Sequence, residues 1–95
     1  MKRLVEDGKF RPTYGATKDG HALNFSPTEM GDVILGLEPR DFYKSTNEKY
    51  NHSVWQDVYK KTVRGLRLYI KFKIFEHEGE YLLILSFKKD ESAVM

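Results

Sequence analysis

The chain has 95 residues and no cysteine, so it has room for one small core and lacks a disulfide framework, a thiol nucleophile and a thiolate metal site. Hydrophobic residues make up 40% and charged residues 32%, which is typical of a globular chain. The longest apolar run, Tyr81–Leu85, is too short to cross a membrane, and the N-terminus lacks the apolar segment of a secretion signal. We therefore expect a single cytoplasmic domain over residues 1–95.

The net charge of +2 conceals an uneven distribution along the chain. Residues 1–42 sum to −1, residues 43–75 to +6 and residues 76–95 to −3. A strongly basic middle third indicates a polyanionic partner. Lysines also fringe ordinary solvated strands, so charge alone leaves both interpretations open.

The first quarter of the chain contains only weak signals. Lys2–Asp7 is predicted to be the end of a helix, stopped by the glycine that follows it. Lys9–Thr13 is predicted to be a short extended segment at an edge, because Pro12 has no backbone donor. Residues 15–25 are ambiguous, since two glycines weaken any helix and the apolar alternation is poor.

A well-marked helix is predicted to begin after Ser26. Ser26 can cap it, Pro27 suits the first helical position and Glu29 completes a capping box. An apolar stripe at helical spacing follows and is predicted to face the core: Met30, Val33, Ile34 and Leu37. Gly36 ends this helix, and a second short helix is expected from Pro39.

The second half of the chain predicts strands. Ser45–Ser53 is polar and is predicted to be a surface loop, after which Val54–Tyr59 alternates like a strand. Leu66–Ile74 has five consecutive apolar alternations, the strongest strand signal in the chain. A turn at His77–Glu80 then leads into a mostly buried strand, Tyr81–Lys88.

A helix-rich first half followed by consecutive strands predicts an α+β fold, with the helices packed on one face of a twisted antiparallel sheet. Trp55 and Phe72 are expected to be structural. Residues 90–95 are expected to form a frayed tail.

Metal and serine chemistry have little support in the sequence. His21, His52 and His77 have no partner at ligand spacing, and the carboxylates are scattered. There is also no G-x-S-x-G segment. We therefore expect no metal site and no cofactor.

What remains is a set of basic, aromatic and hydrogen-bonding side chains: Lys44, His52, Gln56, Tyr69 and Lys88, surrounded by Arg64, Arg67, Lys71 and Lys73. This inventory suits RNA cleavage through the 2′-hydroxyl, where cations stabilise the phosphorane and His, Tyr or Lys moves protons. Each residue is also compatible with a purely structural role, such as a cross-strand aromatic or a solvated strand position. Composition and spacing leave both open.

Several segments together carry a resemblance to a known family: Val33–Leu37, Asp41–Ser45, His52, Val54–Tyr59 and, after Gly65, Leu68–Lys71. From about Leu4 to Lys88 the chain resembles the MqsR family, the motility quorum-sensing regulator toxins of bacterial type II toxin–antitoxin systems. The F-Y-K-S and W-Q-D-V-Y blocks and the spacing between them make this resemblance specific.

The resemblance implies a RelE-like fold, a curved antiparallel sheet with helices against it. It also implies an mRNA interferase that cuts single-stranded RNA at short GC-containing sites without the ribosome. The partner implied is an MqsA-like antitoxin with a zinc-binding N-terminal part and a DNA-binding helix-turn-helix. The zinc and the DNA contact would belong to that partner, and the toxin alone is expected to bind neither DNA nor a membrane.

By motif, the family's functional Lys, Gln and Tyr fall on Lys44, Gln56 and Tyr69. Lys88 of the closing S-F-K and His52 are further catalytic candidates. The basic residues expected to bind RNA are Lys60, Lys61, Arg64, Arg67, Lys71 and Lys73.

The chain departs from the family pattern in two places. Its N-terminal helix is shortened, and its last hairpin has extra residues around Glu76–Tyr81 that could change how substrate approaches. The alternative function is a non-catalytic RNA- or protein-binding module on the same fold. Turnover separates the two, because a binding module retains RNA without producing fragments.

Overall fold

The computed structural model describes residues 2–47, 54–76 and 78–91. Three helices and a short strand come first: α1 (Lys2–Glu6), β1 (Phe10–Pro12), α2 (Tyr14–Ala22) and α3 (Pro27–Leu35). A 3₁₀ turn, η1 (Pro39–Asp41), leads into four strands: β2 (Phe42–Asn47), β3 (Trp55–Val63), β4 (Leu66–Glu76) and β5 (Glu80–Lys89). The predicted α+β class is confirmed.

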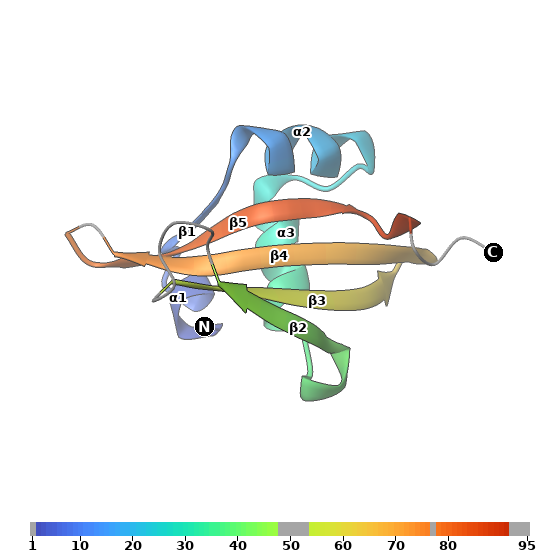
Figure 1. Ribbon diagram of the computed structural model, residues 1–95. Helices are drawn as coiled ribbons and strands as arrows, with labels where there is room; N and C mark the ends of the chain where they lie inside the picture. The colour runs from blue at the N-terminus through green and yellow to red at the C-terminus, as the bar shows by residue number, and fades with distance from the viewer. Residues whose placement is uncertain (1, 48–53, 77, 92–95) are drawn as a thin grey trace.

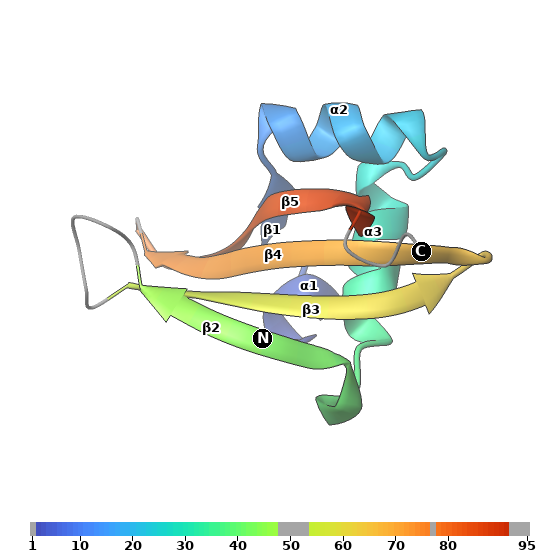
Figure 2. The same cartoon turned by 45° about the vertical axis from the view of Figure 1, so that its right-hand side comes forward.

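The five strands form one sheet in the order β1-β5-β4-β3-β2. Strands β2 to β5 are antiparallel neighbours, whereas β1 pairs parallel with β5 at one edge. The helices lie on one side of the sheet, and β2 bends away from the plane of the other strands (Figures 1 and 2). The sheet is therefore curved, and its other side, which we call the open face, is covered by no helix of residues 2–47, 54–76 and 78–91.

Helix α3 forms where its sequence predicts it. The Ser26 hydroxyl accepts a hydrogen bond from the Glu29 backbone N–H at 3.2 Å, and the Glu29 carboxylate accepts one from the Ser26 N–H at 2.9 Å. These two bonds satisfy donors that the first helical turn leaves unpaired. The four residues of the predicted stripe are all buried: Met30, Val33, Ile34 and Leu37.

Helix α2 resolves the ambiguity of residues 15–25. Thr13 caps it by accepting from the Ala16 N–H at 3.2 Å. Gly20 is buried, and a Cβ there would collide with the end of the Met30 side chain. This glycine lets α2 approach α3 closely, so a residue that weakens the helix signal in the sequence makes room for the Met30 side chain in the packing.

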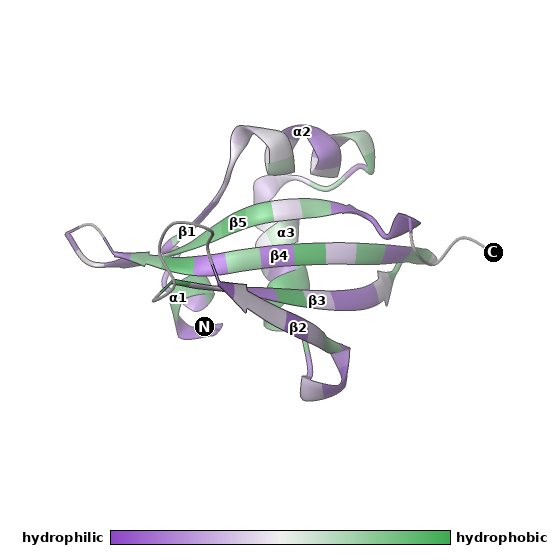
Figure 3. Ribbon diagram, viewed as in Figure 1, coloured by the Kyte–Doolittle hydropathy of each residue, from purple (hydrophilic) through white to green (hydrophobic). Residues whose placement is uncertain are grey.

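The strand predictions hold for β4 and β5. Hydrophobic and hydrophilic residues alternate along β4 (Figure 3). Leu68, Ile70 and Phe72 are at most 2% exposed and pack toward the helices. Leu82, Ile84 and Phe87 of β5 join the same buried cluster. This core fixes which side chains of each strand reach the open face.

Four local predictions need correction. The first three residues of the predicted loop Ser45–Ser53 belong to strand β2, and residues 48–53 lie outside the described residues. The short helix predicted from Pro39 is a single 3₁₀ turn. Trp55 is 56% exposed at the end of β3, so it is not a core residue. Asp90 of the predicted tail 90–95 is 5% exposed and paired, so it is not a solvated tail residue, and residues 92–95 lie outside the described residues.

Candidate active site

Strand register brings most of the predicted catalytic residues to the open face. Lys44 of β2 lies opposite Val58 of β3, which lies opposite Lys71 of β4. One step along, Lys60 of β3 lies opposite Tyr69 of β4. Neighbouring strands are about 4.8 Å apart, so side chains in such rows contact one another.

Tyr69 lies on β4, the middle strand of the sheet. Its row continues to Lys88 of β5, whose Nζ lies 5.4 Å from the centroid of the Tyr69 ring. The ring is half-buried. Two lysines from the flanking strands therefore bracket one tyrosine ring, with Lys60 on one side and Lys88 on the other.

Lys60 is held by two neighbours that the sequence did not single out. Its Nζ lies 3.9 Å from the centroid of the Tyr43 ring and 3.3 Å from a carboxylate oxygen of Asp90. The Nζ of Lys44 lies 5.5 Å from the same Tyr43 ring. The Asp90 backbone N–H donates to the Arg67 carbonyl at 2.7 Å, which anchors the end of the chain to β4.

Gln56 shares the open face but does not touch the tyrosine. It lies opposite Thr46 of β2 and four residues before Lys60 on β3, a separation of roughly 13 Å along the strand. The candidate residues of the face thus form two groups, one around Tyr69 and one around Gln56. Lys44 lies between them, in the row that contains Val58 and Lys71. His52 lies outside the described residues.

Val58, a buried apolar residue, lies between Lys44 and Lys71 in the row that joins β2, β3 and β4. Val58 is 1% exposed yet lies outside the hydrophobic cluster that the helices cover. Lys44 and Lys71 are its register partners on the open face. Long lysine stems can cover apolar surface while their ammonium groups stay in water. This arrangement directs positive charge outward over the centre of the face.

Two of the six residues predicted to bind RNA point the other way. Lys61 lies on the helix side, where its Nζ is 3.5 Å from a carboxylate oxygen of Asp41. Arg64, in the β3–β4 turn, contacts the Glu29 carboxylate at 2.5 Å and the Asn24 carbonyl at 3.1 Å. We therefore do not include Lys61 and Arg64 in the open face. Its basic residues are Arg11, Lys44, Lys60, Arg67, Lys71, Lys73 and Lys88.

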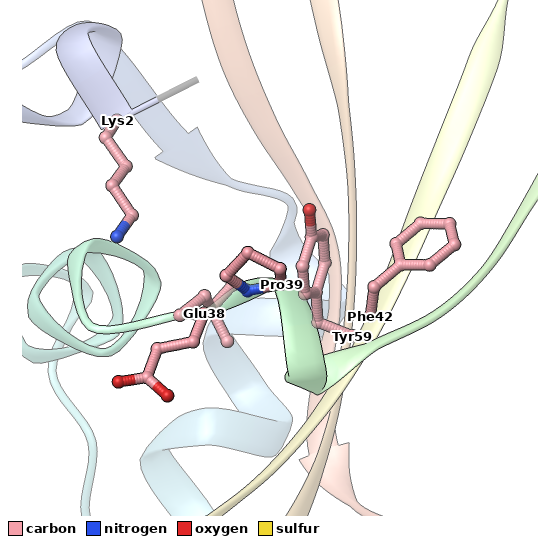
Figure 4. A pocket seen from close by; sticks show the side chains of 6 residues that line it. Lys2, Glu38, Pro39, Phe42 and Tyr59 are labelled. Atoms are coloured by element: carbon pink, nitrogen blue, oxygen red, sulfur yellow. The ribbon is translucent and has the colours of Figure 1, made fainter.

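Another tyrosine, Tyr59, lies on the helix side of β3. Its ring stacks on Phe72 with centroids 5.5 Å apart and lines a pocket of about 530 Å³ with Phe42, Pro39 and Lys2 (Figure 4). Burial, with the nearby Asp57 charge, raises the pKa of the Tyr59 phenol. A phenol with a raised pKa is a poor proton acceptor at neutral pH, so we do not assign Tyr59 the role of general base.

Comparison with known proteins shows which family the chain belongs to. The family model described as motility quorum-sensing regulator, toxin of MqsA, matches residues 1–89. The chain belongs to the MqsR toxin family. A relative from Escherichia coli (strain K12), the mRNA interferase toxin MqsR, is 36% identical over 89 residues, which cover 94% of this chain and 87% of the relative. The resemblance carried by the sequence motifs is confirmed.

Two general properties complete the description of this MqsR family member. Within residues 2–47, 54–76 and 78–91, no group of three or more His, Cys, Asp or Glu side chains is arranged to hold a metal ion. Within the same residues, no helix is long and apolar enough to cross a membrane.

Proposed function

We propose that this protein is an endoribonuclease toxin that cleaves mRNA on the open face of its sheet. The observation that carries the proposal is the convergence of Lys44, Gln56, Tyr69 and Lys88, from four neighbouring strands, on one strongly basic face. Membership of the MqsR toxin family and the mRNA interferase named among its relatives support it.

The reaction is attack of the RNA 2′-hydroxyl on the adjacent phosphorus. A base takes the 2′-hydroxyl proton, cations stabilise the five-coordinate phosphorane, and an acid protonates the departing 5′-oxygen. The products are a 2′,3′-cyclic phosphate, which can open to a 3′-phosphate, and a 5′-hydroxyl. Because the nucleophile belongs to the substrate, the reaction requires no metal ion.

We assign proton transfer to Tyr69 and charge stabilisation to the lysines around it. Lys88 lies beside the ring, so a phosphate bound there meets its ammonium group, whereas Lys60 on the other side is paired with Asp90. Lys44, in the neighbouring row, contributes charge to the same phosphate or the next one along. Gln56 lies two rows from Tyr69, so we assign it the orientation of a nucleotide and no contact with the reacting atoms.

The remaining features of the proposed function follow the family resemblance. The substrate is single-stranded mRNA cut at short GC-containing sites, without the ribosome, in the cytoplasm. An MqsA-type antitoxin is the partner that the family description names. We propose that zinc and DNA binding belong to that antitoxin.

The deciding experiment incubates purified protein with a defined RNA in EDTA and maps the ends of the fragments. We expect 5′-hydroxyl and cyclic-phosphate ends, and no cleavage when a 2′-deoxy nucleotide replaces the one at the cleaved bond. Cleavage that stops with chelator and returns with magnesium would overturn the metal-independent mechanism. Retention of RNA with no fragments would favour the alternative, a non-catalytic binding module.

A further inference from the structure

A second feature of the open face lies at the opposite end of β4 from Tyr69. A pocket of about 190 Å³ is lined there by Arg11, Phe75, Tyr81 and Leu83, from β1, β4 and β5. Phe75 lies directly opposite Tyr81, and Arg11 directly opposite Leu83. Two aromatic rings and a guanidinium therefore surround one small hollow on the same face as the candidate active site.

The pocket has the size and chemistry of a site for one flat ring. Small-molecule sites are usually about 300–1,000 Å³, so 190 Å³ suits a single ring system without its sugar and phosphate. Phe75 is 45% exposed, and the Arg11 guanidinium lies 5.9 Å from the centroid of the Tyr81 ring. Exposed aromatic rings next to arginine are the platform on which proteins stack the bases of single strands.

Strand β4 links this pocket to the candidate active site. Alternate residues of β4 reach the open face, in the order Tyr69, Lys71, Lys73 and Phe75. Tyr69 and Phe75 are roughly 20 Å apart along the strand. The Lys73 ammonium lies 6.0 Å from the centroid of the Phe75 ring, so positive charge continues to the rim of the pocket. A phosphate backbone crossing Tyr69 meets lysines all the way to the pocket.

We propose that Arg11, Phe75 and Tyr81 form a base-binding subsite, which stacks one nucleobase of the RNA substrate a few nucleotides from the bond that is cut. This inference rests on the proposed function, because it takes the open face to be the RNA path. Stacking accepts any base, so the subsite adds affinity and sets the register of the strand without reading its sequence.

The test measures the binding affinity of RNAs that each lack one base, with the abasic position moved along the strand. A 2′-deoxy nucleotide at the cleaved bond keeps each RNA intact during the measurement. We expect wild-type protein to lose affinity about 5- to 150-fold at one position a few nucleotides from that bond, the range for one stacked base. Tyr81→Ala should abolish this sensitivity, and Tyr81→Phe, which keeps the ring, should retain it. Tyr14→Ala is the matched control, because Tyr14 is 84% exposed on α2, away from the open face.

The outcomes separate this inference from the function on which it rests. Wild-type protein that cleaves RNA but tolerates an abasic site at every position away from the cut would overturn the subsite and leave the nuclease intact. Sensitivity that survives in Tyr81→Ala would also overturn it. Wild-type protein that produces no fragments from any RNA would instead refute the proposed function. Melting curves confirm that each variant is folded before binding is compared.

Discussion

Lys60 and Lys61 are neighbours in the chain, yet β3 sends them to opposite faces of the sheet. On the helix side, Lys61 and Arg64 are paired with the carboxylates of Asp41 and Glu29. On the open face, cations stand in rows across the strands, and the pair that joins Lys60 to Asp90 lies at one end of them. The same residue types stabilise the fold on one face and build a positive surface on the other.

This difference shows why net charge alone identifies a partner poorly. A cation that is matched by a carboxylate neutralises its own field, whereas an aligned row of cations sums its field over the surface. Residues 43–75 carry a net charge of +6, but two of those charges are neutralised on the helix side. The uncompensated positive charge therefore belongs to one face and not to the basic segment as a whole.

The core on the helix side is tested most strongly by removing one buried and one exposed aromatic ring, both from this side of the sheet. Phe72→Ala empties a site that is 2% exposed, so we expect it to lower the free energy of unfolding by about 3–5 kcal/mol. Trp55→Ala removes a ring that is 56% exposed, and we expect a change within about 0.5 kcal/mol. Urea denaturation measures both. Equal losses would mean that the helix side does not hold the core.

The two sets of cations are compared by the salt dependence of RNA binding. Each phosphate neutralised on a single strand adds about 0.7 to the slope of log affinity against log salt. Replacing Arg67 and Lys71 with glutamine should lower that slope by about 1.4 if each contacts one phosphate. Replacing Lys61 and Arg64 in the same way should leave it unchanged. Similar slopes for the two double variants would contradict the division between faces.

The smallest expected effect concerns pH and the Glu29–Arg64 pair. The hydrogen bond from Arg64, with those from Ser26, lowers the pKa of Glu29 to about 2. Because the folded pKa lies below the unfolded value of about 4.3, the pair stabilises the fold above that value and is lost as pH falls toward 2. Glu29→Gln should therefore be less stable than wild type at neutral pH and equal to it near pH 2, as measured by urea midpoints. A difference that is constant with pH would exclude this linkage.

The sequence predicts elements whose signals are local. Helix α3 carries its own cap and apolar stripe, and β4 alternates strictly, so both can be recognised without knowing what they contact. Strand β2 could not be recognised this way, because its residues are mostly exposed and show no apolar alternation. It becomes a strand by pairing with β3, a contact that no local pattern encodes.

The candidate site was predictable as a set of residues but not as an arrangement. Motifs pointed to Lys44, Gln56, Tyr69 and Lys88, and register puts all four on one face. The same motifs could not separate Lys60 from Lys61, because that depends on strand register and on a turn with positive φ at Arg64 and Gly65. They also missed Asp90, which is buried by contact with a lysine thirty residues earlier.

The central claim, that chemistry takes place on the open face, is tested most directly by a pair of tyrosines on opposite sides of the sheet. The measurement is the single-turnover rate of cleavage of a defined RNA by Tyr69→Phe and by Tyr59→Phe, with RNA binding measured separately. We predict that Tyr69→Phe binds normally and cleaves about 10²-fold or more slowly, while Tyr59→Phe cleaves at the wild-type rate. Normal cleavage by Tyr69→Phe with weakened binding by Tyr69→Ala would make Tyr69 a stacking platform. Normal cleavage by both Tyr69 variants, or loss of cleavage confined to Tyr59→Phe, would contradict the assignment of the active site to the open face.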